Sequence, residues 1–239
     1  TLSRYTHEVA VQETHNALQV QVDLIARTLE YAQETLERRT ATALDKFIKD
    51  LPPPYLTGST VVLNGQRLPE LMLGEIPGNG NQAYLDAFRY VNPGHDPSFL
   101  VRDGDRFHRA STLLKNKDGQ FRDGEEVRDD YVRAAAEGKA YTGTLERSGR
   151  MYALAARPML DANGKIIGIY TMRMEAEENI ALLKDKLRSI VVGQTGYPFV
   201  VAEPSGDSAS GRFVIHPTLE NQDLGTLGNN RASRIMETM

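Results

Sequence analysis

The chain has 239 residues, 40% of them hydrophobic and 25% charged, which is ordinary for a folded globular protein and excludes a disordered one. Its formal net charge is −4 and its basic residues are dispersed among acidic ones, so nucleic acid is not expected as a partner. It contains no cysteine, which excludes disulfide bonds, thiolate nucleophiles and cysteine zinc sites.

Residues 1–50 predict one long helix, because they contain neither Gly nor Pro and their apolar residues recur at intervals of three and four. The prolines that begin at Pro52 end it. A helix of about 45 residues spans roughly 65 Å, farther than a small domain, so part of it should meet another element or a second chain. The apolar stripe is either a coiled-coil seam or a face packed on its own domain, and comprises Leu18, Val22, Ile25, Leu29, Ala32 and Leu36.

Short strands and turns follow from residue 60. "TVVLNGQRLPELML" predicts a hairpin around Asn64 and Gly65, since Asn-Gly is a strong signal for a two-residue turn. "NQAYLDAFRYV" (81–91) predicts a short amphipathic helix. "PSFLVRDGDRFHRAST" (97–112) then predicts two strands around Asp103 and Gly104.

A helix over 125–138 and three strands over 139–174 complete the predicted domain. The pattern is typical of an α+β fold with a central antiparallel sheet of about five strands. A further helix is expected over 176–192. The strands predicted in "GYPFVVAEPSG" and "RFVIHP" are too few for a core of their own, so the second domain is expected to be incomplete.

No set of residues predicts catalysis. The five histidines show no paired i, i+4 spacing of the kind that zinc sites use. The acidic clusters lie at predicted helix starts, where carboxylates interact favourably with free amides. We therefore expect neither an enzyme nor a protein with a metal or another cofactor.

Four motifs between Leu63 and Met174 resemble the Cache sensor family. They are "LNGQRLPELMLG", "FLVRDGDRFHRAST", "GKAYTGTLERSGRMYALAARPM" and "DANGKIIGIYTMRM". They look like the first module of double-Cache ectodomains, of the Cache 3/Cache 2 fusion type, in bacterial methyl-accepting chemotaxis proteins and some sensor kinases. "VGQTGYPFVVAEPSG" and "RFVIHP" (192–217) resemble the opening of the second module.

The resemblance implies three parts: a signalling and dimerisation helix over 1–50, a membrane-distal PAS-like module over 51–175, and a connecting helix with an incomplete membrane-proximal module over 176–239. It also implies a periplasmic ectodomain of an inner-membrane protein, with the membrane spans outside this chain and a homodimer in the full receptor. The expected function is chemotactic sensing of a small carboxylate or amino acid. The alternative is an ectodomain that binds a periplasmic protein and uses no small-molecule pocket.

Arg109 is the expected ligand anchor, because it matches the Arg of the family's Arg-x-Ser-Thr pattern, with Ser111 expected on the same strand face. A guanidinium suits a carboxylate through two parallel hydrogen bonds. The alternative is that Arg109 pairs with an acid such as Asp103 or Asp105.

Strand alternation places Tyr152, Leu154 and Ala156 on one face. Related single-Cache citrate sensors carry cations at the positions that Leu154 and Ala156 match, so the resemblance argues against a citrate-like polyanion. The tyrosines could line a pocket or belong to the core. The candidate ligand-binding residues are Phe107, Arg109, Ser111, Tyr141, Tyr152, Leu154, Ala156 and Tyr170.

Overall fold

The computed structural model describes residues 2–147, 150–176, 185–191, 196–202 and 211–226. The chain divides into two compact units, one over Gln33–Ala176 and one that combines Thr1–Ala32 with Glu177–Met239. The long helix is confirmed as α1 (Leu2–Lys49), whose residues belong in part to each unit. Among the described residues, no helix is long and apolar enough to cross a membrane.

Part of the apolar stripe of α1 is packed and part is not. Leu36 is buried, Ile25 and Leu29 are half-buried, and Val22 is exposed. The side chain of Leu18 lies outside the described residues. The last turns of α1 are fixed by burial, since Leu44, Phe47 and their neighbours join the core of the Gln33–Ala176 unit.

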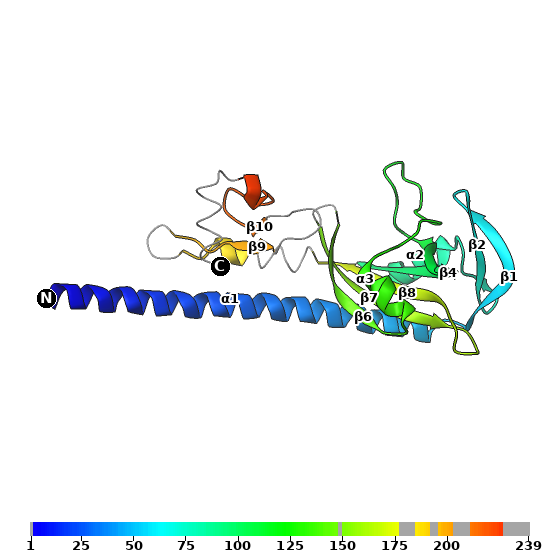
Figure 1. Cartoon of the computed structure of the whole chain (residues 1–239), viewed down its shortest axis with the longest axis horizontal. Coiled ribbons are helices and arrows are strands. Elements are labelled where there is room, and N and C mark those ends of the chain that lie inside the picture. Colours follow the sequence, from blue (N-terminus) through cyan, green and yellow to red (C-terminus); the bar gives the residue numbers. More distant parts are fainter. Residues whose placement is uncertain (1, 148–149, 177–184, 192–195, 203–210, 227–239) are drawn as a thin grey trace. The chain divides into compact units, whose positions relative to one another are not determined.

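The centre of this unit is an antiparallel sheet of five strands, which confirms the predicted sheet of about five strands (Figure 1). The strand order is β5-β4-β8-β7-β6. The strands are β4 (His95–Asp103), β5 (Arg106–Thr112), β6 (Tyr141–Arg147), β7 (Arg150–Leu160) and β8 (Ile166–Glu175). β4, which comes first in the sequence among these strands, pairs with β8, which comes last. Both therefore lie inside the sheet, and β5 and β6 form its edges.

A second sheet of three strands consists of β1 (Pro54–Leu63), β2 (Gln66–Leu73) and β3 (Ile76–Pro77). The predicted turn between β1 and β2 is confirmed: Asn64 has φ 46° and Gly65 has φ 82°, the left-handed values that a two-residue hairpin turn requires. The helix predicted next is also confirmed as α2 (Gln82–Val91), where the Asn81 side chain accepts a hydrogen bond from the amide of Tyr84.

The helix predicted over 125–138 is shorter, because α3 covers only Asp130–Ala136. The residues before it pair with the free edge of β5 instead. Arg109 N donates to Glu125 O at 2.9 Å, and Val127 N donates to Phe107 O at 2.9 Å. Covering an open strand edge satisfies backbone groups that a helix at this position would leave unpaired.

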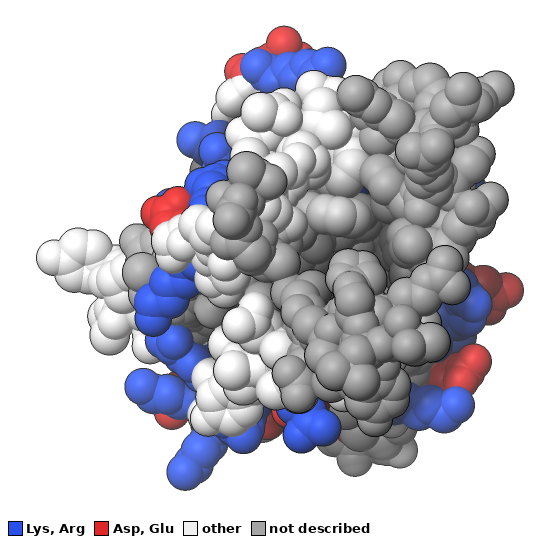
Figure 2. Space-filling view, turned by 90° about the vertical axis from the view of Figure 1, so that its left-hand side faces the viewer, with Lys and Arg blue, Asp and Glu red and all other residues white. Residues whose placement is uncertain are grey.

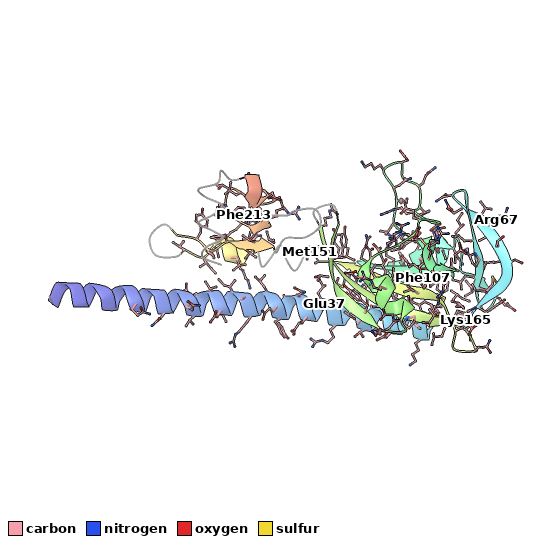
Figure 3. The ribbon with its side chains drawn as sticks, in the orientation of Figure 1. Glu37, Arg67, Phe107, Met151, Lys165 and Phe213 are labelled. Carbon is pink, nitrogen blue, oxygen red and sulfur yellow. The ribbon has the colours of Figure 1, made fainter. Side chains whose placement is uncertain are left out.

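The five-stranded sheet has two covered faces. On the α1 face, the end of α1, α2 and β2 pack on Phe99, Tyr170 and their neighbours. On the α3 face, α3 packs on Leu100, Phe107 and Ile169. Figure 3 shows Phe107 in the middle of this unit, whereas Arg67 and Lys165 lie on its outer strand and turn.

The other unit contains a pair of antiparallel strands, β9 (Val200–Ala202) and β10 (Arg212–Ile215), and a 3₁₀ turn, η1 (Leu224–Thr226). Phe213 is buried beside His216, whose Nδ1 accepts hydrogen bonds from two backbone amides. Residues 185–188 are helical, and the rest of the helix expected over 176–192 lies mostly outside the described residues.

Candidate ligand-binding site

A cavity of about 240 Å³ opens on the α3 face of the five-stranded sheet. One wall is the sheet itself, and the other is the β5–α3 segment (residues 113–129) together with the start of α3. The lining residues are Asp96, Ser98, Arg109, Leu114, Lys115, Arg122, Asp129, Tyr131, Leu145, Tyr152, Leu154, Thr171 and Arg173.

Strand register brings the sheet residues together. Ser98 of β4 is paired with Thr171 of β8, and Leu154 of β7 is paired with Arg173 of β8. Residues directly opposite one another in antiparallel strands point to the same face. β4 therefore joins the consecutive strands β7 and β8, although it lies far from them in the sequence, and the three strands form one surface with polar and apolar side chains.

The β5–α3 segment folds back on itself and supplies the second wall. The Asn116 side chain accepts hydrogen bonds from the amides of Asp118 and Gln120 at 2.9 and 3.0 Å, which closes a turn. Lys115 and Phe121 then lie opposite one another, and the Lys115 ammonium is 4.9 Å from the ring centroid of Phe121. In Figure 1 this segment is the green loop that rises from the sheet beside α2.

Two side chains outside the cavity fix the base of this segment. Asn64 Nδ2 donates to Phe121 O at 2.8 Å and to Asp123 O at 2.9 Å. Asp123 is buried, accepts from Thr112 N at 2.9 Å and is bonded by Gln82 Nε2. Burial raises the pKa of the Asp123 carboxyl, although both hydrogen bonds oppose that rise.

Arg109 enters the cavity from β5. Burial lowers the pKa of its guanidinium, and Tyr131 and Asp129 are among the groups that oppose this effect. Its Nε is buried and has no hydrogen-bond partner among the described residues. A buried donor without a partner is unfavourable by about 1–3 kcal/mol, so this group is prepared for an acceptor that a ligand could bring.

The alternative partners of Arg109 are engaged elsewhere or uninvolved. Asp105 lies 3.9 Å from Arg102, and no ion pair joins Arg109 to an acid among the described residues. Of the other cavity cations, Arg173 donates to Asp96 at 2.8 Å and stacks over Tyr152, 4.4 Å from the ring centroid. Arg122 is 2.7 Å from Glu125.

The cavity brings together three of the residues expected from the sequence, namely Arg109, Tyr152 and Leu154. Phe107 and Ala156 lie on the same sheet face but are packed in its core. Tyr141 is half-buried next to Tyr131, with 6.2 Å between ring centroids, and is not part of the cavity lining.

Ser111 and Tyr170 lie on the α1 face instead. The register of β4 and β5 shifts so that Leu100 is opposite Arg109 but Phe99 is opposite Ser111, which reverses the alternation between the two. Tyr170 packs its ring against Phe99, with 6.1 Å between centroids, and burial raises its pKa to about 12. Neither side chain lines the cavity.

The sequence interpretation missed the second wall altogether. Leu114, Lys115, Arg122 and Asp129 come from a stretch that resembles an ordinary charged surface loop. The available signal was the "NKDGQ" turn, which predicts that the chain reverses and returns beside β5. Pairing of β7 with β8 sets Arg173 opposite Leu154, and this pairing would have placed Arg173 on the cavity face.

Comparison with known proteins agrees with this architecture. The family model of the Cache 3/Cache 2 fusion domain matches residues 3–239. No curated protein matches the chain.

Several solved structures are similar to the chain. The ligand-binding domain of the Pseudomonas aeruginosa PAO1 amino acid chemoreceptor PctC, in complex with GABA, is 16% identical, with a TM-score of 0.47 over 88% of this chain and 79% of that one. The ligand-binding domain of Campylobacter jejuni chemoreceptor Tlp3, in complex with L-valine, is 14% identical, with a TM-score of 0.39 over 84% and 73%. The extracellular domain of the histidine kinase mmHK1S-Z2 is 17% identical, with a TM-score of 0.33 over 66% of each chain. These values are too low to transfer a ligand to this chain.

Proposed function

The chain belongs to the Cache 3/Cache 2 fusion domain family, and from this premise we propose that it is a sensor domain that binds a small anionic molecule beside Arg109. The observation that carries the proposal is a buried guanidinium whose Nε lacks a partner among the described residues and which faces a cavity of about 240 Å³. That volume suits a metabolite smaller than a drug-sized ligand.

The ligand class that fits is a carboxylate or an amino acid. The Arg109 guanidinium would hold a carboxylate through paired hydrogen bonds. Asp129 belongs to the same lining and would accept from an ammonium group. Among the described residues, no group of three His, Asp or Glu could hold a metal ion, and we propose binding without turnover.

The Gln33–Ala176 unit offers a route for the signal. Ser98 lines the cavity, and its neighbour Phe99 points to the other face of β4. There Phe99 stacks on Phe47 of α1, with 5.7 Å between ring centroids and 13° between ring planes. A ligand that shifts β4 would therefore act on the end of α1.

The family supports a wider proposal about context. We place this domain in the periplasm, as the ectodomain of an inner-membrane receptor that dimerises and signals in chemotaxis. The surface is compatible with an aqueous compartment, since charged side chains of both signs occur on the described part of the face in Figure 2.

Calorimetry and thermal unfolding with a panel of small carboxylates and amino acids test the binding function. A true ligand stabilises the fold by about 2.7 kcal/mol at a hundredfold excess over its Kd. Arg109→Ala should reduce that stabilisation to about 0.9 kcal/mol or less at the same ligand concentration. Failure of the whole panel, together with specific capture of a periplasmic protein by the unliganded domain, would favour a protein-binding ectodomain instead.

A further inference from the structure

The charges around the cavity do not balance. The lining residues, their ion-pair partners and the second partner of Arg89 comprise five cations and four acids. The cations are Arg89, Arg109, Lys115, Arg122 and Arg173, and the acids are Asp86, Asp96, Glu125 and Asp129. A cavity whose surroundings carry an excess of positive charge attracts anions.

Two lining cations on opposite walls have no carboxylate partner among the described residues. Arg173 and Arg122 have carboxylates at 2.8 and 2.7 Å. Arg109 on the sheet and Lys115 on the β5–α3 segment have no ion-pair partner among the described residues. The Lys115 ammonium contacts the ring of Phe121, and this cation–π contact restricts its position.

We infer that the cavity is built for a ligand with two anionic groups, one held by Arg109 and the other by Lys115. The inference rests on the proposed function and narrows it to dicarboxylates and acidic amino acids. A monocarboxylate would neutralise only one of the two cations. A larger polyanion such as citrate would bring a third negative charge, but the two remaining cations described in the lining, Arg122 and Arg173, already pair with carboxylates.

Matched ligand pairs test the inference directly, because each pair keeps the shape and removes one negative charge. The probes are succinate against succinamate, l-aspartate against l-asparagine, and l-glutamate against l-glutamine, in calorimetry at one fixed ionic strength. In the pair that fits the cavity, the member with two carboxylates should bind at least about tenfold more tightly than its amide. Succinate and l-aspartate also separate the two ligand sources, since only the amino acid should lose affinity in Asp129→Asn.

A charge-removing variant of Lys115 adds a second measurement. Lys115→Met should reduce the preference for the member with two carboxylates over its amide severalfold. Lys117→Met is the matched control, because Lys117 is exposed on the same loop and does not line the cavity. It should leave the preference intact.

The outcomes separate the two proposals. If the amide binds as tightly as its partner with two carboxylates, the inference is overturned and anion sensing stands. Equal loss of preference in Lys115→Met and Lys117→Met would also overturn it, because a general surface field would then be responsible. If no member of any pair binds, while Arg109→Ala also leaves thermal stability unchanged in their presence, both the inference and the proposed function fail.

Discussion

Arg109 and Ser111 lie on opposite faces of the five-stranded sheet although only one residue separates them. A shift in the register of β4 and β5 sets Arg109 opposite Leu100 and Ser111 opposite Phe99. Arg109 consequently reaches the cavity, while Ser111 is fully buried on the α1 face, where its Oγ has no partner among the described residues. The bulge thus separates the cation from the hydroxyl that follows it in the sequence.

Ser111→Ala should leave ligand affinity unchanged and should not lower the free energy of unfolding, because the lost hydroxyl makes no described hydrogen bond. Thr112→Val is the control, since Thr112 Oγ1 is bonded to Ser98 Oγ at 3.0 Å and to Leu114 N at 3.2 Å. It should cost about 1–3 kcal/mol in urea unfolding. A large loss of affinity in Ser111→Ala alone would place the hydroxyl in the ligand site after all.

Asn64 should affect ligand binding from outside the cavity. Its side chain makes two hydrogen bonds to the base of the β5–α3 segment, which carries Lys115 and Arg122. Asn64→Gly keeps the left-handed backbone but removes both bonds, so we expect a loss of about 1–3 kcal/mol in stability and weaker ligand binding. Asn163→Gly, in the β7–β8 turn, is the comparison, and a fall in affinity as large as that of Asn64→Gly would contradict a positioning role.

Asp123 should make stability fall as pH rises through the acidic range. Burial raises the pKa of its carboxyl in the folded state above its ordinary value of 3.8. The folded state therefore binds this proton more tightly than the unfolded chain does, so the contribution to stability is greatest at low pH and is lost as pH rises through the folded-state pKa. Urea unfolding of the wild type and Asp123→Asn across pH 4 to 7 should show a flatter profile for the variant in this range. Parallel profiles of the two proteins would contradict a raised pKa of the Asp123 carboxyl in the folded state.

The exposed part of α1 should contact its counterpart in the membrane-tethered receptor. Val22 is exposed, and Ile25 and Leu29 are only half-buried, so the apolar stripe is incompletely covered within the described chain. Cysteines at Ile25 or Leu29 should form disulfide crosslinks faster than a cysteine at Gln33, because tethering raises the effective concentration of the facing stripes. Equal rates at all three positions would contradict a seam.

The elements of this fold were predictable because each has a local cause. The Asn64–Gly65 turn, the strands around Gly104 and the absence of Gly and Pro before Leu51 are visible in the sequence. The bulge beside Arg109 is not, since it depends on pairing between β4 and β5, and it displaced the expected Ser111.

The cavity was less accessible to prediction than the fold for the same reason. Tyr152 and Leu154 followed from alternation within one strand, but Arg173 required the register between two strands. Lys115 and Arg122 required a loop whose course is fixed by tertiary hydrogen bonds from Asn64. Contacts between distant segments therefore decide most of the lining.

The central claim is that Arg109 anchors an anionic ligand. Arg109→Ala should weaken binding by about 2–5 kcal/mol, because a desolvated carboxylate would lose its charged partner. Arg109→Lys should recover only part of that loss, since a single ammonium cannot make a two-pronged contact. Arg133→Ala is the matched control, because Arg133 is exposed, pairs with Asp130 at 2.6 Å and lies outside the cavity lining.

Isothermal calorimetry of the tightest-binding member of the ligand panel, with wild type, Arg109→Ala, Arg109→Lys and Arg133→Ala side by side, is the most direct measurement of this claim. We expect wild-type affinity for Arg133→Ala, intermediate affinity for Arg109→Lys and an affinity at least about thirtyfold lower for Arg109→Ala. Wild-type affinity in Arg109→Ala would show that the ligand is bound elsewhere and that Arg109 is not its anchor.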